Sequence, residues 1–181
     1  YRPHAGGYEN GADLVAGIKR IAPFEVSVGA YPERHPDSRD WEEDLDNLAR
    51  KADNGADRAI TQFFFDNDDF ERYREKAAKR GIDIPIVPGI IPIHNFQQVK
   101  RFAGMCGATV PDWLAARFDG LDDDAETRRL VAATVAAEQV FDLVDRGVEA
   151  FHFYTMNRAE LVYALCHLLG IRAPEPEKQA A

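Results

Sequence analysis

The sequence predicts an α/β fold, the C-terminal portion of a (β/α)8 barrel with about four strand–helix units. Four short β-prone segments each precede a helical segment, which implies parallel strands joined by right-handed crossovers. Polar residues follow the predicted strands, as they do at the functional end of such barrels. No GxGxxG or Walker loop supports a doubly wound alternative. A complete barrel needs ~250 residues, and this chain has 181.

The composition indicates a globular protein, because hydrophobic residues make up 45% of the chain. A net charge of −9 without a Lys/Arg cluster argues against nucleic acid and anionic membranes as partners. We see no membrane-spanning run and no signal-like segment. Cys106 and Cys166 form no disulfide framework, so a cytoplasmic location is expected. The scattered histidines lack metal-ligand spacing, so we expect no metal site.

The first predicted helix is capped by Asp13 and ends at Pro23. Its apolar face consists of Leu14, Ile18 and Ile21. A strand over 24–30 follows, and two prolines then fix an extended loop over 31–36.

Two further strand–helix units are predicted in the middle of the chain. A helix over 41–53 carries an apolar stripe of Leu45, Leu48, Ala49 and Ala52. After a strand over 58–66, Asn67 or Asp68 caps a helix that ends before Gly81. Its inward residues are Phe70, Tyr73 and Ala77.

The last part of the chain begins with a strand over 85–91 and a helix capped by Asn95, whose packed residues are Phe96, Val99 and Ala103. A partly helical insertion over 106–122 precedes a long helix over 124–146. We expect six of its residues to face the core: Leu130, Val131, Thr134, Val135, Phe141 and Val144. A strand over 148–154 leads to a helix opened by a capping box of Asn157 and Glu160.

Gln62 is a polar residue inside the apolar strand 58–66. Strand alternation places it on one face with Ile60 and Phe64. A buried amide needs partners, since an unpaired one costs ~1–3 kcal/mol. Gln62 either bonds neighbouring backbone, which the spacing alone favours, or recognises a polar ligand beside aromatic walls.

Polar residues also follow the strand at 24–30, among them Tyr31 and His35. On the next helix, Asp44, Asn47 and Lys51 share one face. A solvated polar face explains this pattern, but the preceding ring and imidazole favour a ligand. Arg50 and Lys51 would suit a pyrophosphate.

Two later positions suggest a second ligand contact. Gln98 and Phe102 are four residues apart and therefore neighbours on a helix. Arg158, at a predicted helix start, requires a nearby anion, either a ligand carboxylate or a surface ion pair. No Ser/His/Asp array or acid–base pair is evident. The residues alone therefore indicate a ligand-binding parallel α/β domain.

The sequence from about Asp13 to Arg172 resembles the methylenetetrahydrofolate reductase family. The resemblance lies in AYPERHP (30–36), RAITQFFFD (58–66), PGIIP (88–92), FDGLDDD (118–124) and FHFYTMNR (151–158). It implies a flavin-containing (β/α)8 barrel. Such an enzyme passes hydride from NAD(P)H to FAD and then to 5,10-methylenetetrahydrofolate, giving 5-methyltetrahydrofolate for methionine synthesis.

The resemblance also implies roles for individual residues. Seven match FAD-binding positions: Tyr31, His35, Ser38, Asp44, Asn47, Arg50 and Lys51. Gln62 matches the glutamine that meets the pterin ring and the nicotinamide. Gln98 and Arg158 match folate-binding positions, and Phe102 matches a ring that packs on folate or nucleotide.

The family's N-terminal half, with its general-acid glutamate, has no counterpart in the sequence. We therefore expect residues 1–172 to form a partial barrel domain and residues 173–181 a flexible tail. As an opening with Tyr1 also suggests, we expect a piece of a homo-oligomeric reductase, inactive alone because loss of the proton donor costs ~10²–10⁴-fold. The alternative is a non-catalytic half-barrel module or subunit that needs a partner chain.

Overall fold

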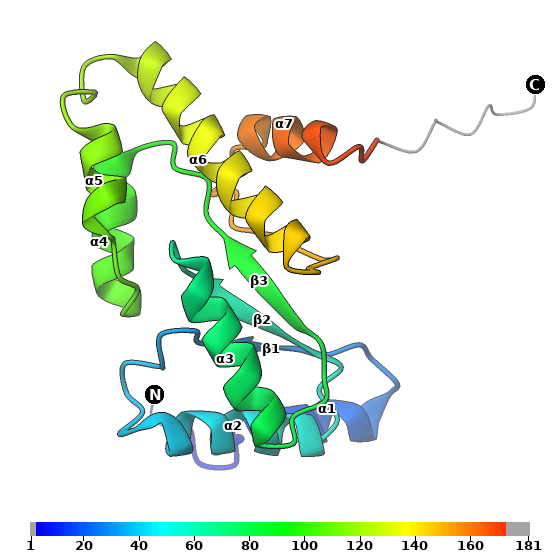
Figure 1. Ribbon diagram of the computed structural model, residues 1–181. Helices are drawn as coiled ribbons and strands as arrows, with labels where there is room; N and C mark the ends of the chain where they lie inside the picture. The colour runs from blue at the N-terminus through cyan, green and yellow to red at the C-terminus, as the bar shows by residue number, and fades with distance from the viewer. Residues whose placement is uncertain (1–2, 173–181) are drawn as a thin grey trace, which may run out of the picture.

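The computed structural model describes residues 3–172, which contain a four-stranded parallel sheet with strand order β1-β2-β3-β4 (Figure 1). The strands are β1 (Ser27–Ala30), β2 (Arg58–Phe63), β3 (Ile86–Ile90) and β4 (His152–Phe153). The helices are α1 (Gly11–Ile21), α2 (Trp41–Asp53), α3 (Asn67–Lys79), α4 (Phe96–Cys106), α5 (Asp112–Phe118), α6 (Ala125–Asp145) and α7 (Glu160–Leu168). The predicted tail over 173–181 lies outside the described residues. None of the helices described is both long and apolar enough to cross a bilayer.

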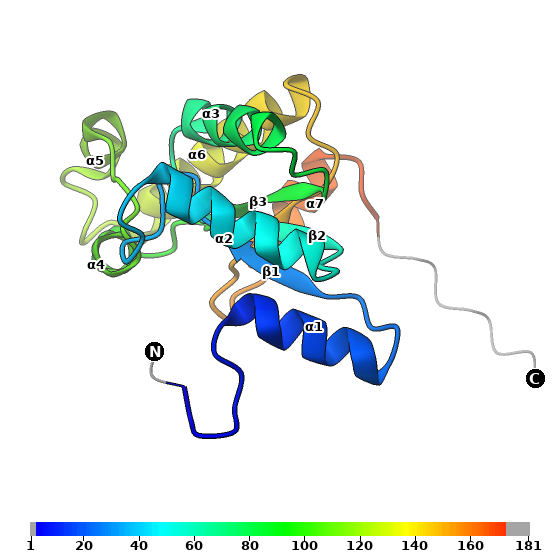
Figure 2. The ribbon, with the colours of Figure 1, turned by 90° about the horizontal axis from the view of Figure 1, so that it is seen from below.

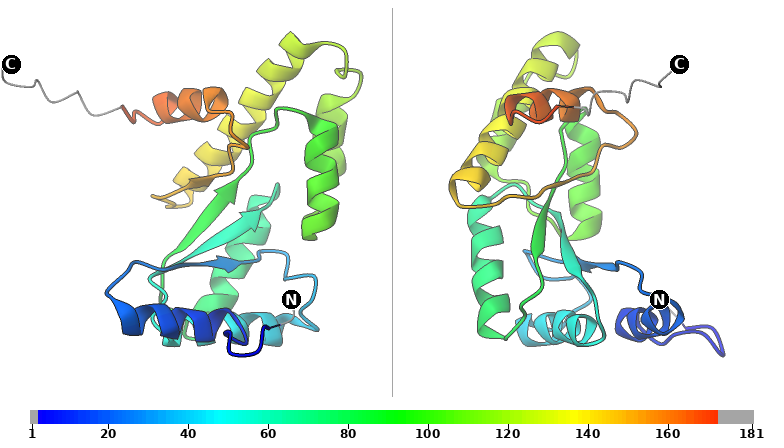
Figure 3. Two further views of the ribbon diagram at one scale, coloured as in Figure 1. Left: turned by 180° about the vertical axis from the view of Figure 1, so that it is seen from behind. Right: turned by 90° about the vertical axis from the view of Figure 1, so that its right-hand side faces the viewer.

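The helices cover the sheet in three apolar clusters. At the β1 end, α2 and α3 pack on Ala30 and Ala59, with α1 beside α2 (Figure 2). In the middle, α3 and α6 enclose Phe64 and Ile90. Beyond the strands, α4, α5, α6 and α7 meet around Phe63. Figure 3 shows α6 and α7 at the end of the sheet opposite α1 and α2.

The pairing of β2 with β3 is irregular, because the register shifts between Ile60 and Phe63. At this point the N–H of Gly89 donates to the hydroxyl of Thr61 at 2.8 Å. A Cβ on Gly89 would collide with the backbone oxygen of Thr61 and lie 2.7 Å from the Tyr154 ring. The strands can therefore approach this closely only with glycine at position 89.

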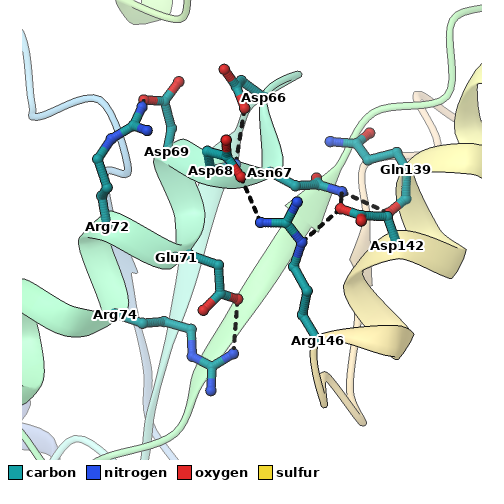
Figure 4. Close-up of polar contacts among 10 residues, drawn as sticks. All are labelled: Asp66, Asn67, Asp68, Asp69, Glu71, Arg72, Arg74, Gln139, Asp142 and Arg146. Carbon is teal, nitrogen blue, oxygen red and sulfur yellow. Dashed lines mark hydrogen bonds and ion pairs between the residues drawn. The ribbon is translucent and has the colours of Figure 1, made fainter.

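A network of hydrogen bonds and ion pairs joins α3 to α6 (Figure 4). Arg146 donates to Asp68 at 2.6 Å and to Asp142 at 2.8 Å. Asn67 donates to Asp142 at 2.7 Å and to the backbone oxygen of Gln139 at 3.0 Å. This network fixes the relative position of two helices that cover the middle of the sheet.

The predicted strand–helix alternation is confirmed, and so are the apolar faces of α2, α3 and α4 and the Asn95 cap. Two predicted caps are wrong. α1 is capped by Asn10, whose side chain accepts from the N–H groups of Ala12 and Asp13, and α3 is capped by Asp66. Leu14 and Ile21 are exposed because α1 buries Ala12, Val15 and Gly17 instead.

The predicted core face of α6 is also largely wrong. Leu130, Phe141 and Val144 are 61%, 41% and 39% exposed, and Thr134 is exposed as well. The buried residues are Ala132, Val135, Ala136, Val140 and Leu143. Because apolar residues occur almost all round this helix, periodicity did not distinguish the two faces.

The start of α7 differs from the predicted capping box. Met156 and Asn157 adopt left-handed conformations with φ of 50° and 61°. The helix begins at Glu160, and its N-cap Ala159 makes no side-chain hydrogen bond. The backbone therefore turns before the helix, and Arg158 lies in that turn.

Candidate functional site

Residues after β1 and along α2 line a hollow of about 660 Å³, here called the α2 hollow. It contains six of the seven predicted cofactor residues: Tyr31, His35, Ser38, Asp44, Asn47 and Lys51. Glu9, Asn10 and Gly11, at the start of α1, complete one side. The loop after β1 and the first turns of α2 thus form one continuous wall, as the shared helix face predicts.

Asp44 organises the loop that closes this hollow. Its side chain is only 5% exposed. One carboxylate oxygen accepts the backbone N–H of His35 and the hydroxyl of Ser38, each at 3.0 Å. The ring of Tyr31 meets that of His35 edge to face, with centroids 4.4 Å apart. Asp44 and Ser38 therefore hold the two rings in place.

Lys51 is the cation of the α2 hollow. Its ammonium group donates to the backbone oxygen of Gly29 at 3.2 Å. Burial lowers the pKa of Lys51 and Arg50 lowers it further, whereas the charge of Asp44 opposes the shift. An anion bound beside Lys51 would stabilise its charged form. It would therefore offset both the burial of the ammonium group and its repulsion by Arg50.

Arg50 is the one predicted cofactor residue that does not line the α2 hollow. It lines a separate hollow of about 500 Å³ with Asp46, Asp53 and Arg80. Its guanidinium group nevertheless donates to the side-chain oxygen of Asn47. Arg50 therefore helps to hold Asn47, which does line the α2 hollow.

A second hollow of about 160 Å³, the α4 hollow, lies beyond β3 and β4. It brings together three of the four predicted substrate residues, Gln98 and Phe102 from α4 and Arg158 from the turn before α7. Ile91, Pro92, Val99 and Met156 supply apolar walls. The cation of Arg158, the amide of Gln98 and the ring of Phe102 converge here, a set suited to an aromatic ligand with a carboxylate.

His94 also lines the α4 hollow, and the sequence reasoning did not single it out. Its Nε2 atom is buried without a hydrogen-bond partner in the described part of the chain. Burial and the charge of Arg158 lower the pKa of His94, while Glu160 and a backbone contact with Arg158 oppose them. Its place between the end of β3 and the cap residue Asn95 was the available signal.

Gln62 lies apart from the α4 hollow. It lines a small hollow with Tyr31, Phe63 and Cys106, so it borders the α2 hollow through Tyr31. Its side-chain oxygen accepts the N–H of Phe63 at 3.0 Å, as the backbone-bonding interpretation predicts. The predicted shared face with Phe64 is wrong, because that ring packs with Phe70 under α3 after the register shift.

No group of three or more His, Cys, Asp or Glu side chains within residues 3–172 is placed to hold a metal ion. The α2 hollow instead combines aromatic rings, two amides and an ammonium group with the carboxylates of Glu9, Asp37, Glu43 and Asp44. The rings and the ammonium group fit an aromatic cofactor with phosphate groups, because rings stack on rings and ammonium binds phosphate oxygens.

Comparison with known proteins identifies the family of the chain. The family model of methylenetetrahydrofolate reductase matches residues 1–170. The 5,10-methylenetetrahydrofolate reductase of Escherichia coli K12 is 54% identical over 161 residues, covering 89% of this chain and 54% of that protein. The Pectobacterium carotovorum reductase is 51% identical over 172 residues, covering 94% and 58%. The chain thus spans about half the length of these relatives.

More distant similarities extend the comparison. Methylenetetrahydrofolate reductase (NADH) 1 of Zea mays is 33% identical over 177 residues, covering 92% of this chain and 30% of that protein. A solved Clostridium thermocellum protein, described as binding two copies of 5-methyl-5,6,7,8-tetrahydrofolic acid, superposes with a TM-score of 0.59. That match covers 92% of this chain and 61% of the other at 16% identity, and it supports the α/β fold of a partial barrel. The chain belongs to the methylenetetrahydrofolate reductase family of oxidoreductases.

Proposed function

We propose that this chain supplies the FAD-binding and folate-binding walls of a flavin-dependent reductase. The reaction is reduction of 5,10-methylenetetrahydrofolate to 5-methyltetrahydrofolate with NAD(P)H, in one-carbon metabolism and methionine biosynthesis. The observation that supports it most is the pair of hollows beyond the strand ends. One collects six of the seven expected cofactor residues and the other three of the four expected substrate residues.

In the α2 hollow, Tyr31 and His35 would pack against the cofactor, and Asn47 would bond its polar chain. Lys51 would pair with its phosphates, with Arg50 holding Asn47 in position. FAD supplies the two-electron step between nicotinamide and folate when bound. The protein's own contribution is to bind and orient these groups.

In the α4 hollow, Phe102 would pack on the aryl group of folate and Arg158 would pair with a carboxylate of its glutamyl end. A volume of about 160 Å³ is below the ~300–1,000 Å³ usual for a whole ligand, so this hollow would hold only part of the substrate. Gln62, whose oxygen is already bonded, would offer its NH₂ group to the pterin or nicotinamide.

We assign no general acid among the described residues and expect the proton donor to be a glutamate of the family's N-terminal half. Little turnover is therefore expected from this chain alone. The full-length form is proposed to be cytoplasmic and homo-oligomeric.

Titration of FAD into the chain, followed by flavin fluorescence, tests the proposal. We expect saturable binding that Lys51→Met weakens about tenfold and that Lys79→Met, at an exposed lysine of α3, leaves unchanged. By calorimetry, Arg158→Met should weaken 5-methyltetrahydrofolate binding, unlike the exposed control Arg129→Met. A folded chain that binds neither ligand would contradict the proposal.

A second candidate is a binding module or subunit that pairs with a separate chain. It is favoured by the sheet edges, since within residues 3–172 β1 and β4 each pair with one neighbour only. Sedimentation velocity distinguishes the two, because such a module should self-associate or bind its partner, and a monomer at high concentration would count against it.

A further inference from the structure

Tyr73 places an unpaired hydroxyl group in the wall of the α2 hollow. The residue lies on α3 and is only 1% exposed. Its hydroxyl oxygen is buried and has no hydrogen-bond partner among residues 3–172. The residue lines the hollow together with Asp44, Asn47 and Leu48 of α2. The hydroxyl is therefore buried at the boundary of the ligand space.

The ring of Tyr73 has apolar packing partners, but its oxygen has no hydrogen-bond partner among residues 3–172. The ring packs in the cluster of Leu45, Leu48 and Ala77, and it contacts Trp41 at a centroid distance of 6.3 Å. A phenylalanine would make the same apolar contacts without a buried unpaired group, which destabilises a folded protein. Buried polar groups without a protein partner call for an explanation, such as a bound ligand.

Neighbouring groups offer no acceptor for the proton of this hydroxyl, since the adjacent backbone N–H of Tyr31 can only donate to its oxygen. The nearby carboxylate of Asp44 accepts from His35 and Ser38 through its Oδ1 atom, and neither of its oxygens accepts from the Tyr73 hydroxyl. Burial, and next the charge of Asp44, raise the pKa of Tyr73 far above neutral pH, so the phenol keeps its proton and can donate it. The hydroxyl is thus a donor without an acceptor.

We propose that Tyr73 is a further ligand-binding residue, whose hydroxyl group donates a hydrogen bond to an oxygen of the ribityl-phosphate portion of the cofactor in the α2 hollow. This inference rests on the proposed function, because it takes the ligand of this hollow to be a flavin. It adds a contact from α3 to a wall otherwise built from the β1 loop and α2.

The variant Tyr73→Phe tests the inference because it removes only the oxygen atom. In the ligand-free chain, relief of the unpaired hydroxyl should raise the melting temperature by about 2–4 °C. FAD should bind about tenfold more weakly, since one hydrogen bond to the ligand is lost. A residue with a purely structural role would not change stability and affinity in opposite directions.

Tyr163→Phe, at a 63% exposed tyrosine of α7, is the matched control and should alter neither quantity. Titrations of riboflavin, FMN and FAD into Tyr73→Phe and the wild-type chain locate the contact. If the variant binds all three more weakly, the hydroxyl contacts the ribityl chain. If it binds only FMN and FAD more weakly, the hydroxyl contacts a phosphate. Unchanged flavin affinity in Tyr73→Phe, or a fall in ligand-free stability, would overturn the inference while leaving the proposed function intact. Failure of the wild-type chain to bind any flavin would overturn both.

Discussion

Asp44→Ala tests whether one buried carboxylate holds the loop that closes the α2 hollow. The side chain accepts two hydrogen bonds of 3.0 Å, from the His35 N–H and the Ser38 hydroxyl. A hydrogen bond to a charged group contributes ~1.5–3 kcal/mol. Because alanine also relieves the cost of burying the charge, we take the lower value for each bond. The expected loss in the free energy of unfolding is about 3 kcal/mol.

Urea unfolding followed by circular dichroism measures this loss, and a flavin titration below the transition measures the accompanying loss of FAD affinity. Asp44→Asn keeps an acceptor oxygen and should cost about half as much. Asp46→Ala, on the same helix, removes only an exposed ion pair with Arg80 and should cost ~0.2–1 kcal/mol. If Asp44→Ala costs no more than Asp46→Ala, the loop does not depend on this carboxylate and the reasoning is refuted.

Three further predictions concern the backbone, a helix cap and a titrating group. Gly89→Ala should destabilise the chain by several kcal/mol because its Cβ would collide with the backbone of the adjacent strand, whereas Gly104→Ala, with open space around it, should stabilise by ~0.4–1 kcal/mol; thermal melts compare the two. Asn10→Ala should cost ~1 kcal/mol as the loss of a true cap, and Asp13→Ala clearly less, a ranking that urea unfolding checks. Lys51 binds an anion only while protonated, and its pKa is lowered mainly by burial, so FAD affinity should fall as pH rises toward that pKa; titrations across alkaline pH should lose this slope in Lys51→Met.

The fold could be predicted where the polarity of a segment differs sharply between its faces. In α2, Leu45 and Leu48 belong to one apolar stripe of a helix that is otherwise mostly polar or charged, so only that stripe was expected to face the apolar core. In α6 the apolar residues Leu130 and Phe141 form a second, exposed face beside the buried face that contains Val140. Only the shape of the neighbouring helices decides between such faces, and local sequence does not contain that information.

For the candidate site, the sequence indicated which residues share one helix face and line one hollow, and it was less informative for single residues. Asp44 was expected beside the cofactor, but its partners in the preceding loop could not be predicted from spacing. Gln62 was assigned to a face by regular alternation, which the irregular pairing of β2 with β3 interrupts. His94 was missed because, unlike His35, it was examined only for metal-ligand spacing.

The exposed side of α6 has a practical consequence for work with this protein. α6 packs against α3, α5 and α7, and these contacts leave Leu130, Phe141 and Val144 exposed. Retention on a hydrophobic column, and loss of material at high salt, should therefore arise in part from this helix, along with other exposed apolar side chains such as Ile21 and Met105. Glutamate or lysine at position 130 or 141 is the first choice for a better-behaved preparation, since neither change touches the ligand hollows.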